Sequence, residues 1–179
     1  MDKQNNDVLK SKISPIILRI PQINDAKELL NILTDIRNTE YDPHINKGLT
    51  LDNVNSMVTR MRKSTTLDNP NSFNFVIIDT SINKLIGLGG FGHIDINNKI
   101  GDVGVIINFD FRGKGYATEA IKMSINYGFN NLKLNEVTAT MLEKNIPMRN
   151  LLDKRLKLKG IKRKSEFGYE YFYSVKSEF

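Results

Sequence analysis

The sequence predicts an α+β fold, in which helices cover both faces of a sheet of six to seven strands. Three observations lead to this prediction. Short runs of apolar and β-branched residues recur along the chain, as strands require. Other segments carry apolar residues at spacings of three and four, as amphipathic helices do. Between Asp102 and Asn131 an apolar strand pattern passes through a glycine-containing loop into such a helical pattern, so a strand and a helix adjoin there.

The first part of the chain predicts one strand followed by two helices. Residues 16–20 form an apolar run, which predicts the strand. Asp25, with Glu28 three residues later, resembles a capping box at the start of the first helix. The apolar stripe of that helix is formed by Ala26, Leu29, Leu30, Leu33 and Ile36. Thr50 is the candidate cap of the second helix, whose apolar face is formed by Leu51, Val54, Val58 and Met61.

The rest of the chain predicts mainly strands. The expected elements are strands at 73–78 and 85–94, a strand from about residue 100, the central helix, a strand at 136–142, a short helix at 147–156 and a strand at 169–175. A chain of 179 residues without an internal repeat or a linker predicts one domain, residues 13–179. Residues 1–12 are polar and lack a hydrophobic signal region, so we expect a disordered or loosely attached tail there.

The central unit predicts an anion site. An apolar strand at 103–107 leads through a short turn to a loop, residues 112–117, which opens into a helix beginning near Ala117. One face of this helix carries its apolar and small residues, which are Ala117, Ala120, Ile121, Ser124, Ile125, Gly128, Phe129 and Leu132. The first turn of a helix has unpaired N–H groups and about half a positive charge. Gly113 and Gly115 permit positive φ and close approach of a ligand. The unit therefore predicts a phosphate or pyrophosphate site.

Two familiar nucleotide motifs do not explain this loop. A P-loop would end in Lys-Ser/Thr, which is absent, and a dinucleotide fingerprint would need Gly or Ala where Thr118 stands. Residues 87–92 do match G-x-G-x-x-G, but an Asn-Asn turn follows them instead of a helix. Without a helix dipole the motif lacks the site for a pyrophosphate. We interpret residues 87–92 as a glycine-bearing strand in close backbone packing.

The loop fits a different pattern, R-x-x-G-x-A, through Arg112, Gly115 and Ala117, followed by Thr118-Glu119-Ala120. In this the chain resembles the GNAT superfamily of acetyl-CoA-dependent N-acyltransferases. It looks most like the branch that acetylates protein N-termini, ribosomal proteins and small amines. The resemblance runs from residues 18–20 to Asn145. It implies a GNAT-like central sheet that is mixed, mostly antiparallel, and in which the strand before the loop splays from the strand at 136–142.

The resemblance also implies a set of residues that bind acetyl-CoA as co-substrate. The main chain of Ile106 and Ile107 would bind the pantetheine arm in the splay, as an added strand binds a sheet edge. The pyrophosphate would lie on Arg112, Gly113, Lys114, Gly115, Tyr116 and Ala117. Asn145 matches the family's asparagine that contacts the coenzyme arm, although asparagine also favours plain turns. The oxyanion of the reaction would need a backbone N–H on the Ile107 side.

The implied reaction is direct attack of a neutral amine on the thioester, so a base or a water relay must take the amine proton. Asp102 stands where many relatives carry a glutamate at the start of the strand, and it is one candidate catalytic residue. His93 is the other, because histidine changes charge near neutral pH. A surface charge for Asp102 and a structural role for His93 are the alternatives. Glu143 and Tyr41 are further candidates without a spacing argument.

One departure from the family concerns the proton donor to the leaving thiolate. Met148 stands at the family's serine and Leu152 at its occasional tyrosine, the proposed donor. A thiol has a pKa near 8.5, so its thiolate can leave without a donor. We therefore expect an N-acetyltransferase that acts on an amine of a protein N-terminus, a side chain or a small molecule. The alternative is a catalytically silent acyl-CoA-binding module.

Composition excludes several other classes of protein. The chain has no cysteine, which removes disulfides, thiolate metal sites and a cysteine nucleophile. Its two histidines, His44 and His93, are too few for a histidine metal cluster, so we expect no metal. No apolar run is as long as a membrane span, so we expect a cytoplasmic protein without a membrane partner. A monomer and a homodimer both stay open.

The net charge of +6 is concentrated in a basic run, which consists of Lys154, Arg155, Lys157, Lys159, Lys162, Arg163 and Lys164. Such a run is usually a solvated face. It could also steer the phosphates of an anionic coenzyme or hold an acidic partner. Nucleic acid is not expected, because the sequence contains no recognised binding module.

Overall fold

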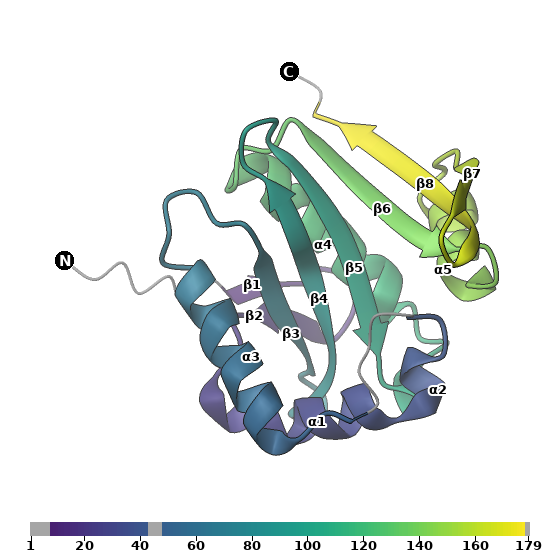
Figure 1. The fold of residues 1–179 in the computed structure, drawn as a ribbon. Helices are drawn as coiled ribbons and strands as arrows, with labels where there is room; N and C mark the ends of the chain where they lie inside the picture. Colours follow the sequence, from purple (N-terminus) through teal and green to yellow (C-terminus); the bar gives the residue numbers. More distant parts are fainter. Residues whose placement is uncertain (1–7, 43–47, 178–179) are drawn as a thin grey trace.

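The structure, a computed structural model, describes residues 8–42 and 48–177. Its centre is an eight-stranded sheet in the order β1-β2-β3-β4-β5-β6-β8-β7 (Figure 1). The strands are β1 Val8–Lys10, β2 Ile16–Arg19, β3 Phe73–Asp79, β4 Lys84–Asp95, β5 Ile100–Ile107, β6 Glu136–Leu142, β7 Ile161–Ser165 and β8 Gly168–Lys176. Neighbouring strands are antiparallel, except that β5 and β6 are parallel. The mixed, mostly antiparallel sheet is confirmed.

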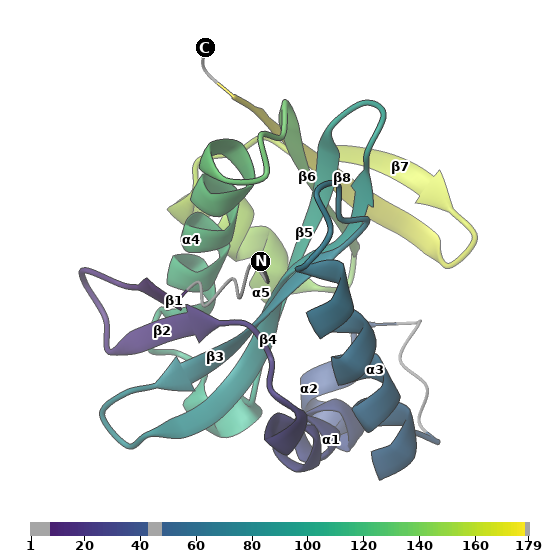
Figure 2. The ribbon, with the colours of Figure 1, turned by 90° about the vertical axis from the view of Figure 1, so that its left-hand side faces the viewer.

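Helices cover both faces of this sheet, as expected. The helices are α1 Ala26–Thr34, α2 Ile36–Thr39, α3 Leu51–Ser64, α4 Tyr116–Asn130 and α5 Ile146–Asn150, which runs into a π-helical turn at Leu151–Arg155. Figure 2 shows α1, α2 and α3 on one face and α4 and α5 on the other. Each face has its own apolar core. Ile121 and Leu152 belong to the α4 side, whereas Leu29 and Val58 belong to the α1–α3 side.

The sheet has more strands than the six to seven expected, because two short strands form its edges. Val8–Lys10 pair with β2, so the prediction of a loosely attached tail is wrong for these residues. Ile161–Ser165 pair with β8. The sequence of β7 is Ile-Lys-Arg-Lys-Ser, which carries little strand signal. Charged side chains are, however, a common way to protect an exposed sheet edge from pairing with other chains.

The two predicted helix caps have different outcomes. Thr50 caps α3, since its Oγ1 accepts a hydrogen bond from the Asn53 N–H at 3.3 Å, and Val54 and Val58 are buried. Asp25 does not cap α1. Its carboxylate instead accepts a hydrogen bond from the Gln22 N–H at 2.6 Å and pairs with Arg19 at 2.7 Å. The carboxylate thus binds Arg19 and the Gln22 N–H, which precede the helix, and the local capping pattern does not indicate these partners.

The glycines at 87–92 lie within β4, which confirms the interpretation of this segment as a glycine-bearing strand. A Cβ atom on Gly87 would come within 2.4 Å of the Ile106 carbonyl oxygen. A Cβ atom on Gly90, which has φ of +112°, would come as close to the Phe73 carbonyl oxygen. Both positions therefore need glycine because neighbouring strands approach too closely for a side chain.

The splay between β5 and β6 is the feature that the site depends on. The two strands pair only at Ile100–Glu136, Gly101–Val137 and Asp102–Thr138. Beyond this point they diverge, as Figure 1 shows. Each stays paired on its other side, β5 with β4 and β6 with β8. The predicted splayed pair is confirmed, and it leaves two facing strand edges open.

Candidate active site

A cavity of about 1080 Å³ follows the splay. Its walls are the open edge of β5, the loop at 112–115, the start of α4, the end of β6 and one side of α5. Asp102 lies at the closed end of the splay and Asn38 of α2 lies near its open end, and both line the cavity. A volume of this size exceeds most drug-sized pockets and is adequate for a large ligand together with a second molecule.

The backbone groups that face the splay follow from the register of β5 with β4. The Asn108 N–H donates to the Ile86 carbonyl at 2.8 Å, so Asn108 faces β4. Because residues of an antiparallel strand alternate in direction, Ile106 faces β4 as well, opposite Leu88. Val105 and Ile107 therefore direct their N–H groups into the splay, where the β6 ladder supplies no partner. We expected Ile106 and Ile107 to face the splay; in the structure Val105 takes the place of Ile106.

The loop before α4 has the geometry of an anion site. Gly113 and Gly115 both have φ of +80°, a conformation that side chains with a Cβ rarely adopt. Gly115 is the N-cap of α4, which begins one residue earlier than expected, at Tyr116. The first hydrogen bond of the helix runs from the Glu119 N–H to the Gly115 carbonyl. The three amides of residues 116–118 therefore lack an intrahelical acceptor and are available to an anion at the loop.

The side chains of this loop act differently from their backbone. The Tyr116 ring is buried, and its hydroxyl donates to Asp79 Oδ2 at 3.0 Å. Burial raises the pKa of Asp79, but hydrogen bonds from Ser81 and Tyr116 outweigh it and hold the pKa below 3.8. The Lys114 ammonium lies 5.4 Å from the Phe111 ring centroid. Tyr116 can therefore contribute its amide to a ligand, whereas its side chain secures the start of α4.

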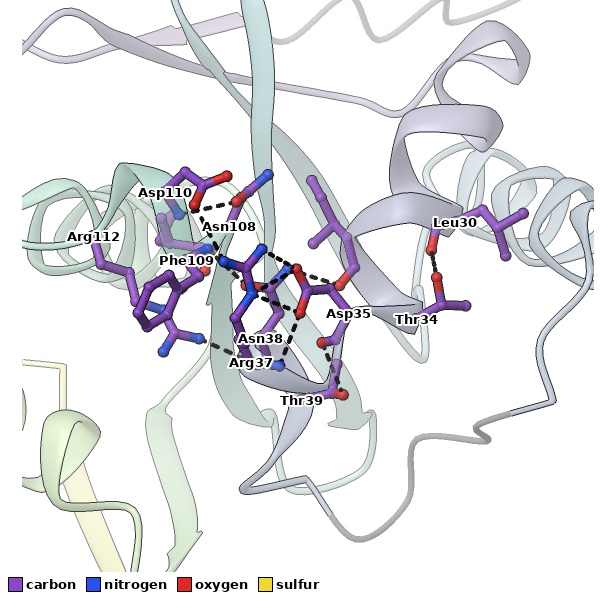
Figure 3. Close-up of polar contacts among 12 residues, drawn as sticks. Leu30, Thr34, Asp35, Arg37, Asn38, Thr39, Asn108, Phe109, Asp110 and Arg112 are labelled. Carbon is purple, nitrogen blue, oxygen red and sulfur yellow. Dashed lines mark hydrogen bonds and ion pairs between the residues drawn. The ribbon is translucent and has the colours of Figure 1, made fainter.

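Arg112 is tied to the protein at two points (Figure 3). Its Nε donates to the Ile107 carbonyl at 3.2 Å, and its Nη2 donates to the Asn38 carbonyl at 3.4 Å. Asn38 is buried, donates from Nδ2 to the Ile32 carbonyl at 2.9 Å and accepts from the Phe109 N–H at 2.6 Å. These bonds join the α1–α2 corner to the loop that follows β5. Sequence reasoning missed Asn38, because nothing around a single asparagine indicates that it is buried.

Replacing Asn38 by alanine is expected to lower the free energy of unfolding by about 1–3 kcal/mol, because it leaves the Phe109 N–H and the Ile32 carbonyl without their partner. Denaturant unfolding measures this change. Asn126→Ala on the exposed side of α4 is the control and should change stability little. Equal stability of the two variants would contradict the role given to Asn38.

The two candidate catalytic residues lie next to each other. Asp102 is half-buried, and its Oδ1 accepts a hydrogen bond from Thr138 Oγ1 at 3.0 Å across the last paired rung of β5 and β6. His93 faces Asp102 from β4 and is exposed. Burial raises the pKa of Asp102 above its ordinary 3.8, although the Thr138 hydrogen bond and the charge of His93 oppose the rise. Asp102 lines the cavity, which gives it the better position for a base.

The remaining candidates divide between the cavity and the surface. Tyr41 lines the cavity, whereas Glu143 forms an ion pair with Lys162 at 2.6 Å. Asn145 lines the cavity and also caps α5, since its Oδ1 accepts from the Met148 N–H at 3.2 Å. Leu152 is only 1% exposed, in the core beneath α4. The position of the family's proton donor is thus a core position in this chain.

Metal and membrane sites find no support in the described part of the chain. No group of three or more His, Asp or Glu residues in it could hold a metal ion. His44 lies outside the described residues. None of the helices in residues 8–42 and 48–177 combines the length and the apolar character needed to cross a bilayer.

Comparisons with known proteins agree with this geometry. The family model of the acetyltransferase (GNAT) domain matches residues 16–155. Over 138 residues the chain is 28% identical to the uncharacterized N-acetyltransferase p20 of Bacillus licheniformis. This alignment covers 77% of this chain and 76% of that protein.

Two solved structures have the same fold. The spermidine N-acetyltransferase of Vibrio cholerae, in complex with CoA and spermine, has a TM-score of 0.78 at 18% identity and covers 90% of this chain and 95% of its own. The microcin C7 self immunity acetyltransferase MccE, in complex with acetyl-CoA and AMP, has a TM-score of 0.76 at 20% identity. The match covers 91% of this chain and 93% of the MccE chain. With its splayed strands and its glycine loop, the chain belongs to the GNAT family of acetyltransferases.

Proposed function

We propose that this protein transfers the acetyl group of acetyl-CoA to a primary amine. The observation that carries the proposal is the open edge of β5, which ends at a glycine loop and the start of α4. An extended amide-containing arm can pair with such an edge, and a diphosphate can lie on the amides of the loop. An acyl-CoA has both groups in one molecule. The residues present therefore fit this co-substrate.

The two faces of the splay suit two different molecules. Ile107 belongs to the core on the α4 side, and Ile106 packs on the α1–α3 side. Because side chains alternate along a strand, Asp102 shares the α1–α3 face with Ile106. The helix α4, which begins directly after the glycine loop, lies on the opposite face. The coenzyme would enter from the α4 side and the amine from the side of Asp102, so that they meet in the gap between β5 and β6.

The chemistry needs a base, an oxyanion partner and a leaving group. Acetyl-CoA supplies an activated acetyl group. Asp102, as the carboxylate, takes the proton that the amine must lose, directly or through a water. The amine nitrogen bonds to the thioester carbon, and an N–H of the open β5 edge, on the Ile107 side, stabilises the oxyanion. The C–S bond then breaks, and the thiolate takes a proton from solvent, since Leu152 offers none.

The acceptor is an amine of a protein N-terminus, a side chain or a small molecule. The proposed domain is residues 13–179. A chain without cysteine suits a reducing compartment, and we place the reaction in the cytoplasm.

Calorimetry followed by a thiol-release assay tests the proposal. Acetyl-CoA and CoA should both bind, and thiol release should then depend on the amine when polyamines, lysine peptides and peptides with a free N-terminus are compared. The N-acetylated form of each peptide is the matched control and should release no thiol. Binding without turnover for every amine would instead favour the silent acyl-CoA-binding module, which the core position of Leu152 also allows.

A further inference from the structure

The hairpin of β7 and β8 forms part of the cavity wall and also one edge of the sheet. Phe167, in the turn between the two strands, and Glu170 of β8 both line the cavity, whereas Phe172, opposite Ile161, does not. β7 is the last strand in the sheet order, so its outer side has no partner among the described strands. Figure 2 shows the hairpin projecting at the edge of the sheet. An open strand edge therefore begins beside the cavity, at Ser165, and runs away from it toward Ile161.

This open edge is strongly basic. The segment 157–164, which leads into β7 and forms most of it, contains no acidic residue. Its cations, together called the basic edge, are Lys157, Lys159, Lys162, Arg163 and Lys164. Lys162 pairs with Glu143 at 2.6 Å, and Arg163 pairs with Glu170 at 2.5 Å. The other three cations are exposed and have no ion pair among the described residues, so the edge keeps an excess of positive charge.

The acceptor side of the cavity carries the opposite charge. Asp102 is opposite Thr138 of β6, and Glu170 is opposite Leu142 of the same strand. Because Thr138 and Leu142 are four residues apart on one strand, all these side chains share a face of the sheet. Besides burial, the charge of Glu170 raises the pKa of Asp102, so the two carboxyl groups interact across the splay. An acidic pocket for an ammonium group thus adjoins a basic strand edge.

We propose that the acceptor is a polypeptide and that the basic edge binds an acidic segment of it while its amine reaches Asp102. The inference rests on the proposed function, because it takes the acceptor amine to be acetylated in the cavity. An extended segment that leaves the cavity beside Ser165 can pair with the outer side of β7 as an added strand. Acidic side chains on that strand would lie opposite the lysines of β7, and such cross-strand pairs are stabilising.

Charge and strand edge together distinguish this acceptor from the alternatives. A polyamine suits the carboxylates of the cavity, but it has no strand to add and its further positive charges are repelled by the basic edge. A second copy of the chain offers a strand edge of the same charge, and like charges on paired strands are destabilising. A nucleic acid has the right charge, but its backbone cannot continue a sheet. An acidic polypeptide satisfies both features.

Steady-state acetylation of matched peptides tests the inference. Each peptide has a free N-terminus and about twelve residues, enough to span β7 at about 3.4 Å per residue. One peptide carries glutamate and the other glutamine at alternate positions of its second half. The KM of the glutamate peptide should be about tenfold lower, with a similar kcat, because the basic edge does not contact the reacting atoms. N-methylation of the glutamate segment keeps its charge, removes its N–H donors and should raise KM toward that of the glutamine peptide.

Charge reversal at the basic edge gives the complementary test. In the double variant Lys159→Glu, Lys164→Glu the preference for the glutamate peptide should disappear or invert. The control is Lys63→Glu, Lys122→Glu, which changes the same charge at exposed positions of α3 and α4 and should keep the tenfold preference. A dipeptide is too short to lie along β7, so all three proteins should acetylate it equally. This separates docking from catalysis and from folding.

Equal KM values of the unaltered protein for the glutamate and glutamine peptides would overturn the inference, and acetylation of the dipeptide would leave the proposed function intact. The inference is also wrong if the N-methylated peptide is used as well as its parent, or if the control variant loses the preference. A single-stranded RNA that binds the unaltered protein but not the Lys159→Glu, Lys164→Glu variant, without any preference for the glutamate peptide, would assign the edge to nucleic acid instead. If no amine is acetylated, the proposed function itself fails.

Discussion

Replacing Gly115 by valine is expected to weaken acetyl-CoA binding by about tenfold to a hundredfold. Gly115 has φ of +80°, and a residue with a Cβ is strained there by about 1–2 kcal/mol, more when it is β-branched. A Cβ atom would meet nothing within 4 Å, so the effect comes from the backbone and not from a clash. The backbone relieves the strain by moving, and the amides that follow Gly115 then no longer converge on one anion.

A second glycine provides the control for strain. Gly168 has φ of +108°, has open space around its Cβ position and is the first residue of β8, directly after the turn that joins β8 to β7. Gly168→Val should therefore lower stability to a similar degree and leave the affinity for acetyl-CoA unchanged. Gly115→Asn should fall between the native protein and Gly115→Val, since asparagine tolerates this conformation. Calorimetric titration measures all three. Unchanged affinity in Gly115→Val would contradict the anion site.

Replacing Asp102 by asparagine is expected to lower kcat by about a hundredfold to ten-thousandfold, the usual contribution of a positioned base. The KM for acetyl-CoA should change little. Steady-state kinetics on the best amine of the panel measure both values. Asparagine keeps an oxygen that can accept the Thr138 hydroxyl, so local structure is retained. A variant with full activity would show that another group, such as His93, takes the proton.

The same carboxylate links activity to pH and to stability. Burial raises the pKa of Asp102 above 3.8, so activity should be lost, as pH falls, at a higher pH than for an ordinary aspartate. Because the pKa of Asp102 is higher in the folded than in the unfolded chain, the folded state binds this proton more tightly. The free energy of unfolding therefore falls as the pH rises from 3.8 through the raised pKa of the folded state. Asp102→Asn removes that loss and should be at least as stable as the native protein at neutral pH. The Thr138 hydrogen bond lowers the pKa of Asp102, so in Thr138→Val the loss of activity on the acidic side of the pH–rate profile should move to still higher pH.

Much of the fold was predictable because its signals are local. The alternation of residues 136–142 predicted β6, the pattern around Gly113 and Gly115 predicted the loop and its helix, and Thr50 predicted its cap. In each case residues within one or two turns of each other fix the structure. The splay required the family resemblance, because the point at which two strands part depends on pairing between distant segments.

What could not be predicted from the sequence depends on partners far along the chain. The direction of each β5 amide is set by the register with β4, which is why Val105 and not Ile106 faces the splay. Tyr116 at the start of α4 contacts Asp79 at the end of β3, and Arg112 contacts the carbonyl of Asn38, although each pair is far apart in sequence. Residue type alone does not indicate that Arg112, and not Lys114, donates hydrogen bonds to backbone carbonyls of the protein.

Hydrogen exchange of backbone amides, measured residue by residue with and without CoA, tests the proposed mode of coenzyme binding most directly. The N–H groups of Val105 and Ile107 should exchange quickly in the free protein and become protected when CoA pairs with the open edge of β5. The Ile106 N–H, which faces β4, should be protected in both states and serves as the internal reference. Saturating CoA that leaves Val105 and Ile107 unprotected would show that the coenzyme does not lie in the splay.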